Sequence, residues 1–350
     1  MRKTWLKTTA MALKCALCLF ACTAAAQAKH TDDLVVMTNG DRMTGEIKSL
    51  QRGELTFKAD YMAESVELDW SRVARLESKD PYLISMTDGH QFAEHFKLDD
   101  NGGGDNFLIG SGGQVKVSQM NVLRILPIET RFWKQLEGSI GLGVNYTSGN
   151  DQYQTELTAT ATYRRGSHAV TGSIDSAFSG QTHGTRNARN QFDIDYRKQV
   201  SPRWFAGGLF DLLRSDQQSL ELRITGGGIL GRNLVRTERT RFSTFFGVAA
   251  NREKYKVAPA RQWTTNADAV GGFDFTTFRF SKTDLTSHLL VFPSLTTPGR
   301  VRTQLKSDLN YKLAKDFWWG FHLYENFDSR PPIKADKNDL GISASISWKF

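Results

Sequence analysis

The chain has 350 residues, of which 39% are hydrophobic and 23% charged, with a net charge of +8 and a mean hydropathy of −0.42. Arg2, Lys3, Lys7 and Lys14 lie within residues 1–28, which contain no acid, so removal of that segment lowers the net charge by four to +4. A charge of that size gives no support to nucleic acid as a partner.

The first expected element is a secretory signal peptide over residues 1–28. Basic residues precede an apolar run from Met11 to Ala26, and Ala26-Gln27-Ala28 has the small-x-small pattern that signal peptidase cleaves. The alternative is a membrane anchor helix, but the run spans only roughly 15 residues against the ~20 that a spanning helix needs.

All three cysteines, Cys15, Cys18 and Cys22, lie inside this segment, so cleavage after Ala28 leaves a chain without thiols. Disulfide bonds and thiol catalysis are then excluded. A lipoprotein cleavage box ending at Cys22 is the alternative, although Phe20 fits such a box poorly.

Residues 31–127 predict a small β-domain built from two copies of one unit, over about 31–79 and 80–127. Met37-Thr38-Asn39-Gly40 corresponds to Met86-Thr87-Asp88-Gly89, and Val73-Ala74-Arg75-Leu76 to Val122-Leu123-Arg124-Ile125, with an offset of 49. The Asn-Gly and Asp-Gly pairs favour type I′ hairpin turns, because both residues accept positive φ. We expect two SH3-like or Sm-like modules.

Residues 135–350 alternate between apolar and polar side chains with a period of two, which is typical of β-strands with two different faces. In the last segment Leu340, Ile342 and Ile346 share one parity, whereas Ser343 and Ser345 share the other. We expect about twelve antiparallel strands, near residues 135–146, 152–164, 167–179, 190–199, 203–214, 219–231, 239–251, 262–275, 283–292, 300–313, 317–327 and 338–349.

The fifth and ninth of these strands alternate poorly, so ten or fourteen strands are the alternatives. Three features favour a transmembrane barrel over a soluble sandwich. The strands span ~10–13 residues, whereas soluble strands run ~5–6. Tight connections such as Arg165-Gly166 alternate with long charged segments near 181–189, 252–261 and 328–338. Aromatic residues also gather near the strand ends, as at a membrane interface.

Aromatic side chains are predicted at two membrane interfaces, with Trp133, Tyr163, Trp204 and Trp348 at one rim and Tyr146, Tyr153 and Trp263 at the other. The terminal Phe350 on an amphipathic strand resembles the assembly signal of outer-membrane proteins. Charged residues of both signs are expected to line the lumen: Glu156, Asp193, Asp195, Arg197, Glu221, Arg223, Arg241, Asp268, Arg302, Lys306 and Asp308. They could form a weakly selective pore, or ion pairs that close it, and the second interpretation is slightly preferred.

The chain resembles a known family at several motifs. Asn39-Gly40-Asp41 through Gly45 and Trp70-Ser71-Arg72-Val73 precede a barrel that opens with Gly138-Ser139-Ile140-Gly141-Leu142-Gly143 and continues to Thr147-Ser148-Gly149-Asn150. This pattern is similar to the YdiY-like outer-membrane family of unknown function, also labelled salt-induced outer-membrane protein. The resemblance covers nearly the whole exported chain and implies an outer-membrane barrel, but no substrate or catalytic residue.

The sequence predicts no catalytic residue, no cofactor and no metal site, because the histidines form no metal-binding pair on one face of a helix. His288 and His322 are expected to face the lumen, where a serine of the last strand could complete a Ser-His hydrolase. A solvated or structural histidine is the preferred interpretation, and the chain is therefore expected not to be an enzyme.

We therefore expect a bacterial outer-membrane β-barrel with a structural or small-solute pore role and with residues 31–127 in the periplasm. The expected partners are outer-membrane lipid, lipopolysaccharide and the outer-membrane assembly machinery. Residues 31–127 would be either a docking surface for peptidoglycan or a periplasmic protein, or a support or plug for the barrel. A barrel that merely anchors a periplasmic binding domain is the alternative function, and a lumen hydrolase is the least favoured.

Overall fold

The computed structural model describes residues 33–87, 90–97, 106–109, 115–128, 136–147, 152–181, 186–237, 239–256, 262–280, 282–314, 316–331 and 335–349. The expected signal peptide, Trp133 and Phe350 lie outside these described residues. No helix within the described ranges is long and apolar enough to cross a membrane.

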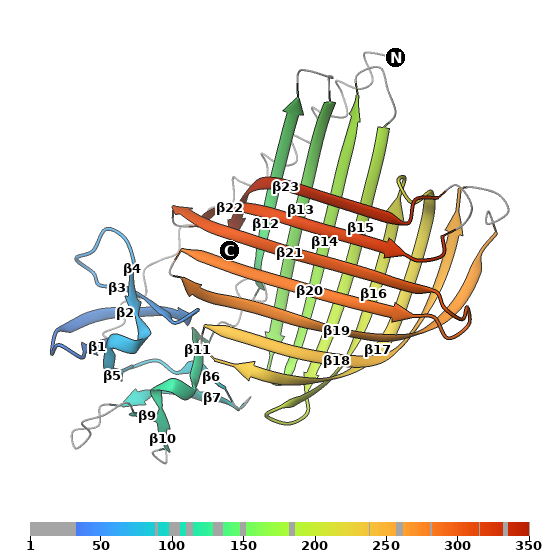
Figure 1. Ribbon diagram of the computed structural model, residues 1–350. Coiled ribbons are helices and arrows are strands. Elements are labelled where there is room, and N and C mark those ends of the chain that lie inside the picture. The colour runs from blue at the N-terminus through green and yellow to red at the C-terminus, as the bar shows by residue number, and fades with distance from the viewer. Residues whose placement is uncertain are drawn as a thin grey trace.

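The C-terminal region is a closed antiparallel barrel in which each strand pairs with its neighbour along the chain and the last strand pairs with the first (Figure 1). The prediction of twelve strands is confirmed. They are β12 Leu136–Thr147, β13 Gln152–Arg165, β14 His168–Gln181, β15 Arg186–Gln199, β16 Trp204–Ser215, β17 Leu220–Arg236, β18 Thr240–Tyr255, β19 Thr264–Phe280, β20 Thr283–Pro293, β21 Val301–Ala314, β22 Phe317–Asp328 and β23 Asn338–Lys349.

The alternation of the sequence becomes the two faces of this barrel. Large apolar side chains on the outer face are exposed, including Leu142 at 61%, Val144 at 74% and Ile342 at 65%. Their neighbours Ser343 and Ser345 are buried in the interior. An apolar surface of this extent is unusual for a soluble protein and is what contact with lipid requires.

The N-terminal region forms an eight-stranded antiparallel sheet and a three-stranded sheet. In the first sheet the order is β4-β3-β2-β11-β6-β7, with β1 paired to β2 and β5, and in the second it is β10-β9-β8. The elements are β1 Asp33–Met37, β2 Arg42–Gln51, β3 Glu54–Lys58, β4 Val66–Asp69, the 3₁₀ helix η1 Trp70–Arg72, β5 Val73–Glu77, β6 Tyr82–Met86, β7 Gln91–Glu94, β8 Phe96–Lys97, β9 Asn106–Ile109, β10 Val115–Ser118, η2 Gln119–Asn121 and β11 Val122–Pro127.

The two sequence copies pack against each other. Residues that are equivalent in the two copies touch each other: the Trp70 indole donates to the Gln119 carbonyl at 3.2 Å, and the Tyr82 hydroxyl donates to the Asp33 carboxylate at 2.6 Å. The Gln119 amide donates back to the Trp70 carbonyl. In addition, the last strand of the second copy, β11, pairs with β2 of the first.

One hydrophobic core serves both copies. It contains fully buried side chains from the first copy, such as Ile47 and Phe57, and from the second, such as Ile84 and Ile125. Because each copy supplies only part of this core, the pair forms one folding unit rather than two independent modules.

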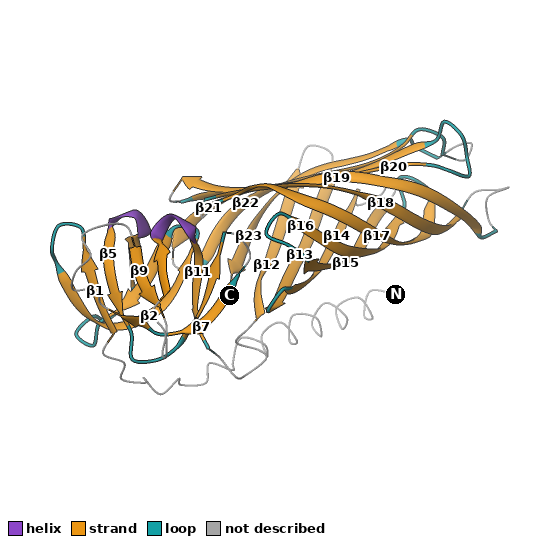
Figure 2. Cartoon of the chain, turned by 90° about the horizontal axis from the view of Figure 1, so that it is seen from below, coloured by secondary structure: helices purple, strands orange, loops and turns teal. Residues whose placement is uncertain are grey.

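This domain lies against one end of the barrel (Figure 2). Arg239 in the β17–β18 turn lies 3.2 Å from Asp69, and Lys312 near the end of β21 pairs with Glu67. The connections at this end have two to four residues, whereas those at the far end have four to nine. The N-terminal domain therefore docks on the short-turn side.

Candidate functional site

Of the eleven charged residues that the sequence predicted in the lumen, ten are buried or line an internal cavity. The buried residues are Glu156, Arg223, Asp268 and Arg302. The residues that line the internal cavity are Asp193, Asp195, Arg197, Arg241, Lys306 and Asp308. Glu221 departs from this pattern. A register shift in the β17–β18 ladder between Leu220 and Leu222 leaves it exposed, where it pairs with Lys254 at 2.9 Å.

Ion pairs cross the middle of the lumen. Lys306 on β21 reaches the opposite wall, where its ammonium lies 2.6 Å from Asp193 and 2.5 Å from Asp175. Beside it, Gln304 donates to Asp211 at 3.3 Å. Because these strands lie on opposite sides of the ring of twelve, their contacts span the interior of the barrel.

A second ionic network lies at the end of the barrel remote from the N-terminal domain. Arg300 donates to Glu253 at 2.5 Å and to Asp328 at 2.6 Å, and Arg223 donates to Glu253 at 2.9 Å. The Tyr255 hydroxyl accepts from both guanidinium groups. All of these side chains are buried, which is tolerable for charges only because each is paired.

The β16–β17 loop folds inward at the same end. Ser215 donates to Asp339 on β23 at 2.6 Å, and Gln218 donates to the Asn326 carbonyl on β22 at 2.8 Å. Both acceptors belong to strands on the far side of the barrel, so the end of β16 and the loop after it reach across this end of the barrel.

One wall of the lumen is apolar, which the sequence analysis did not predict. Phe205, Ile229, Phe245, Val270 and Phe292 form a buried cluster on β16 to β20. The signal was present in the sequence, because the fifth and ninth expected strands, now β16 and β20, alternate poorly. These strands carry apolar residues on both faces, toward lipid and toward the interior.

A cavity of about 2100 Å³ occupies the half of the barrel next to the N-terminal domain, and residues from both parts line it. We call it the vestibule. Arg52, at the tip of the β2–β3 hairpin with a φ of 58°, enters the barrel mouth. Its guanidinium lies 3.1 Å from Asp284 and 5.0 Å from the ring centroids of Phe278 and Trp318.

Sequence reasoning missed this contact because no local pattern connects residue 52 with residue 284. The Arg52-Gly53 dipeptide between two strands marks a hairpin tip, but a hairpin tip does not reveal its partner. Lys349 completes the cluster, with its ammonium 2.6 Å from Asp284 and 3.6 Å from the Trp318 ring centroid.

Three residues on adjacent strands form a hydrogen-bonded chain with the connectivity of a serine hydrolase triad. The two nitrogens of His322 lie 2.6 Å from Asp308 and 2.7 Å from the Ser345 hydroxyl. Asp308 and His322 line the vestibule, whereas Ser345 does not and is 3% exposed. A nucleophile must be open to its substrate, so this chain is better suited to holding the barrel wall together.

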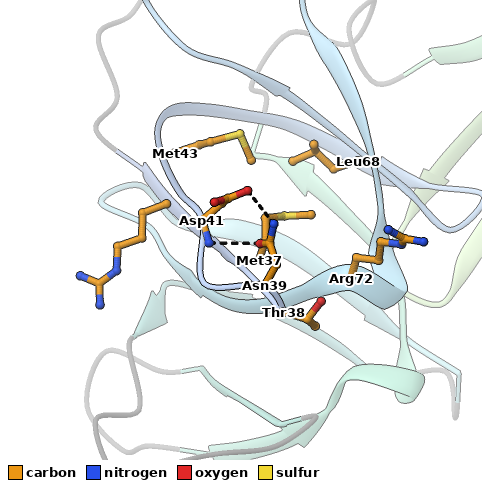
Figure 3. Close-up of a pocket in the computed structure, with 8 residues that line it drawn as sticks. Met37, Thr38, Asn39, Asp41, Met43, Leu68 and Arg72 are labelled. Carbon is orange, nitrogen blue, oxygen red and sulfur yellow. Dashed lines mark hydrogen bonds between the residues drawn. The ribbon is translucent and has the colours of Figure 1, made fainter.

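A smaller pocket of about 450 Å³ lies on the N-terminal domain, outside the barrel (Figure 3). Met37, Met43 and Leu68 give it an apolar surface, and Arg72 lies at its edge. Asn39 shapes the hairpin beside it by donating to the Asp41 carboxylate at 2.6 Å.

The predicted interfacial aromatics fall into two groups. Tyr163, Trp204 and Trp348 lie toward the N-terminal domain, and Tyr146, Tyr153 and Trp263 lie toward the other end of the barrel. Trp204, Trp263 and Trp348 are each about two fifths exposed. Arg232 and Arg252 stack near Trp204 and Trp263, with 5.7 Å and 5.1 Å to the ring centroids. Within the described ranges, no cluster of His, Asp and Glu could hold a metal ion.

These features define a closed twelve-stranded barrel with an apolar exterior, an internally paired lumen and a capping β-domain. Residues 140–350 match the family described as "Protein of unknown function, DUF481", and the chain belongs to that family. None of the curated proteins compared with the chain matches it.

Among solved structures, the NanC porin is 12% identical, with a TM-score of 0.40 over 61% of this chain and 100% of its own. The translocator domain of the autotransporter NalP from Neisseria meningitidis is 12% identical, with a TM-score of 0.33 over 61% of this chain and 86% of its own. Another porin is 14% identical, with a TM-score of 0.29 over 92% of this chain and 99% of its own.

Proposed function

We propose that this protein is a bacterial outer-membrane barrel whose lumen is held shut by ion pairs and which presents a solute-accepting vestibule to the periplasm. The N-terminal domain covers that vestibule as a cap. The observation that carries the proposal is the bridge from Lys306 across the lumen to Asp175 and Asp193.

The membrane location is supported by the exposed apolar outer face and by the aromatic residues near both strand ends. A sheet can cross lipid only when it closes, because an open edge would leave backbone groups without partners. We place the N-terminal domain in the periplasm because outer-membrane barrels carry their short turns on that side. The expected signal peptide agrees with export.

The closed state is supported by the number and position of the internal pairs. A buried charge that loses its partner is strongly destabilised, so opening the lumen requires all of the crossing pairs to separate together or to exchange with ligand. A solute could therefore enter the vestibule from the periplasmic side, but it could not pass through the outer half of the barrel in this state.

The test is single-channel recording of the refolded mature chain in planar bilayers, with a heat-modifiability gel to show that the barrel has folded. We expect a folded barrel with no discrete conductance steps at moderate voltage. Frequent long-lived steps from the wild-type chain would show an open pore and overturn the closed-lumen proposal.

A second candidate function is that the barrel anchors a periplasmic docking domain, and the pocket of Met37, Met43, Leu68 and Arg72 favours it. Peptidoglycan or a periplasmic protein would be the partner. Deletion of residues 31–127 discriminates between the two functions. Capture of the partner should vanish under the anchor function, whereas under the vestibule function the deletion changes access to the lumen. We also propose that the chain belongs to the YdiY-like family, also labelled salt-induced outer-membrane protein, which its motifs resemble.

A further inference from the structure

The mouth of the vestibule gathers positive charge from four different strands. Arg164 lies next to the end of β13, Arg236 and Arg241 lie on β17 and β18, and Arg124 comes from β11 of the N-terminal domain. All four side chains line the vestibule. The charges therefore meet only where the cap contacts the barrel.

These arginines lie close to other positive charges, which is electrostatically unfavourable. Arg236 and Arg241 stand directly opposite each other in the β17–β18 ladder, an arrangement that destabilises a sheet when the charges are alike. Burial, together with the positive charges of Arg164 and Arg241, lowers the pKa of Arg124 to about 9. Such crowding raises the cost of burying the Arg124 and Arg241 charges.

The acids that line the vestibule are largely committed elsewhere. Asp284 pairs with Arg52 and Lys349, and Asp274 pairs with Arg197 and His288. In the same way Glu67 pairs with Lys312, and Glu137 with Arg124.

For two of the arginines the described residues supply no such partner. Neither Arg164 nor Arg241 forms an ion pair with a carboxylate in the described part of the chain. The Arg241 Nε is buried without a hydrogen-bond acceptor, although its guanidinium lies 5.9 Å from the Phe278 ring centroid. A buried guanidinium N–H that lacks an acceptor is costly, and an anion at this point would supply one.

We propose that the vestibule mouth is an anion-binding site in which Arg124, Arg164 and Arg241 hold a small phosphate- or carboxylate-bearing solute. The planar guanidinium fork matches both groups with two parallel hydrogen bonds. A cavity of about 2100 Å³ has room for such a solute with its water. The inference deepens the proposed function, on which it rests, by naming the class of solute that the vestibule accepts.

Because Arg124 belongs to the cap and the other two arginines to the barrel, the bound anion would join the two parts. The site would then couple occupancy of the vestibule to docking of the N-terminal domain. An anion site at the rim also accounts for the position of these arginines. Deeper in the lumen, Lys306 is already neutralised by Asp175 and Asp193.

The experiment measures binding of inorganic pyrophosphate, with citrate as a carboxylate probe, to the folded full-length mature protein in detergent at constant ionic strength. Isothermal titration should show one saturable site in the wild type. Arg164→Gln and Arg241→Gln should each weaken binding by about tenfold or more, as the loss of a charge-assisted hydrogen bond predicts. Arg241→Lys, which keeps the charge but loses the fork, should fall between.

Arg232→Gln is the matched control, because Arg232 stacks near Trp204 on the outer face of β17 and should leave binding unchanged. A heat-modifiability gel shows that each variant is folded. The proposal is overturned if the wild type binds neither probe, or if a folded Arg164→Gln, Arg241→Gln double variant binds as the wild type does.

A lipid headgroup has similar chemistry and is separated by competition. Displacement of pyrophosphate by short-chain phosphatidylglycerol but not by citrate would assign the arginines to lipid and overturn the solute proposal. Conductance is measured independently, so an open wild-type pore would overturn the closed lumen, whereas absent anion binding in a closed barrel would overturn only this site.

Discussion

Replacement of Lys306 by methionine tests whether cross-lumen pairing closes the barrel. The substitution keeps most of the side-chain volume but removes the charge that neutralises both Asp175 and Asp193. All three side chains are about one quarter exposed. Loss of one partner from a buried pair costs about 3–5 kcal/mol, and partial exposure places the expected loss of unfolding free energy near the lower end, at about 3 kcal/mol.

The matched control is Lys254→Met, which removes the same group from a more exposed 2.9 Å pair with Glu221, at the end of the barrel away from the N-terminal domain. An exposed pair contributes about 0–1 kcal/mol, so this variant should be nearly as stable as the wild type. The free energy of unfolding is measured in urea with refolded protein in lipid vesicles, and conductance is recorded in planar bilayers.

We expect Lys306→Met to be destabilised and to show brief cation-selective steps, because two carboxylates then face an unbridged lumen. Adding Asp175→Asn and Asp193→Asn should restore much of the stability, because these substitutions remove the two carboxylate charges that Lys306→Met leaves without a partner. Equal stability of Lys306→Met and Lys254→Met, with no conductance in either, would refute the reasoning.

Three further predictions concern other parts of the chain. Tyr82→Phe should lower the unfolding free energy of the protein by about 1.5–3 kcal/mol, because it removes a hydrogen bond to the buried carboxylate of Asp33. Chemical denaturation measures this loss, and a neutral result would contradict a stabilising contact between the two copies. Burial alone would raise the pKa of Asp69, but hydrogen bonds from Ser71 outweigh it, so that pKa is lowered. The ionised Asp69 therefore stabilises the fold above the carboxyl's unfolded pKa, and this stabilisation is lost as the pH falls through the folded pKa. Asp69→Asn should reduce the loss of stability at acid pH that pH-dependent melts measure. Ser345 should not react with a fluorophosphonate probe, since it is 3% exposed; labelling that disappears in Ser345→Ala would instead favour the hydrolase.

The fold of the barrel was predictable because its cause is local and repeated. In β12 and β23, every second side chain must suit lipid and the others must suit the interior, so residues such as Leu142 and Ile342 mark the outer face without knowledge of any contact. The same rule explains the uncertain strands. Phe205 in β16 and Phe292 in β20 face an apolar interior, and the alternation on which the prediction depends is lost there.

Bulges are a second feature that could not be predicted from the sequence. Glu221 was assigned to the lumen by counting alternate residues, but the register shift beside it changes which way the side chain points. A one-residue shift reverses the faces of a strand, and the sequence of β17 carries no clear signal for it.

In the N-terminal domain, the offset of 49 residues marked the two copies. The closing strand of each copy pairs with the first strand of its own copy, β5 with β1 and β11 with β6, but the additional pairing of β11 with β2 of the first copy follows from tertiary packing around the shared core. The contact of Trp70 with Gln119 joins two positions whose residue types differ, so the repeat itself could not indicate it.

By itself the sequence indicated about twelve strands, the two faces of the barrel and the repeat, because each depends on neighbours along the chain. Only the tertiary structure decided that Lys306 bridges to Asp193, that Arg52 enters the mouth, and that Arg124 meets Arg164. These pairs lie far apart in sequence, and the closure of the barrel and the docking of its cap bring them together. Whether charges line a channel or neutralise one another depends on distances across the lumen, and these distances cannot be predicted from strand periodicity.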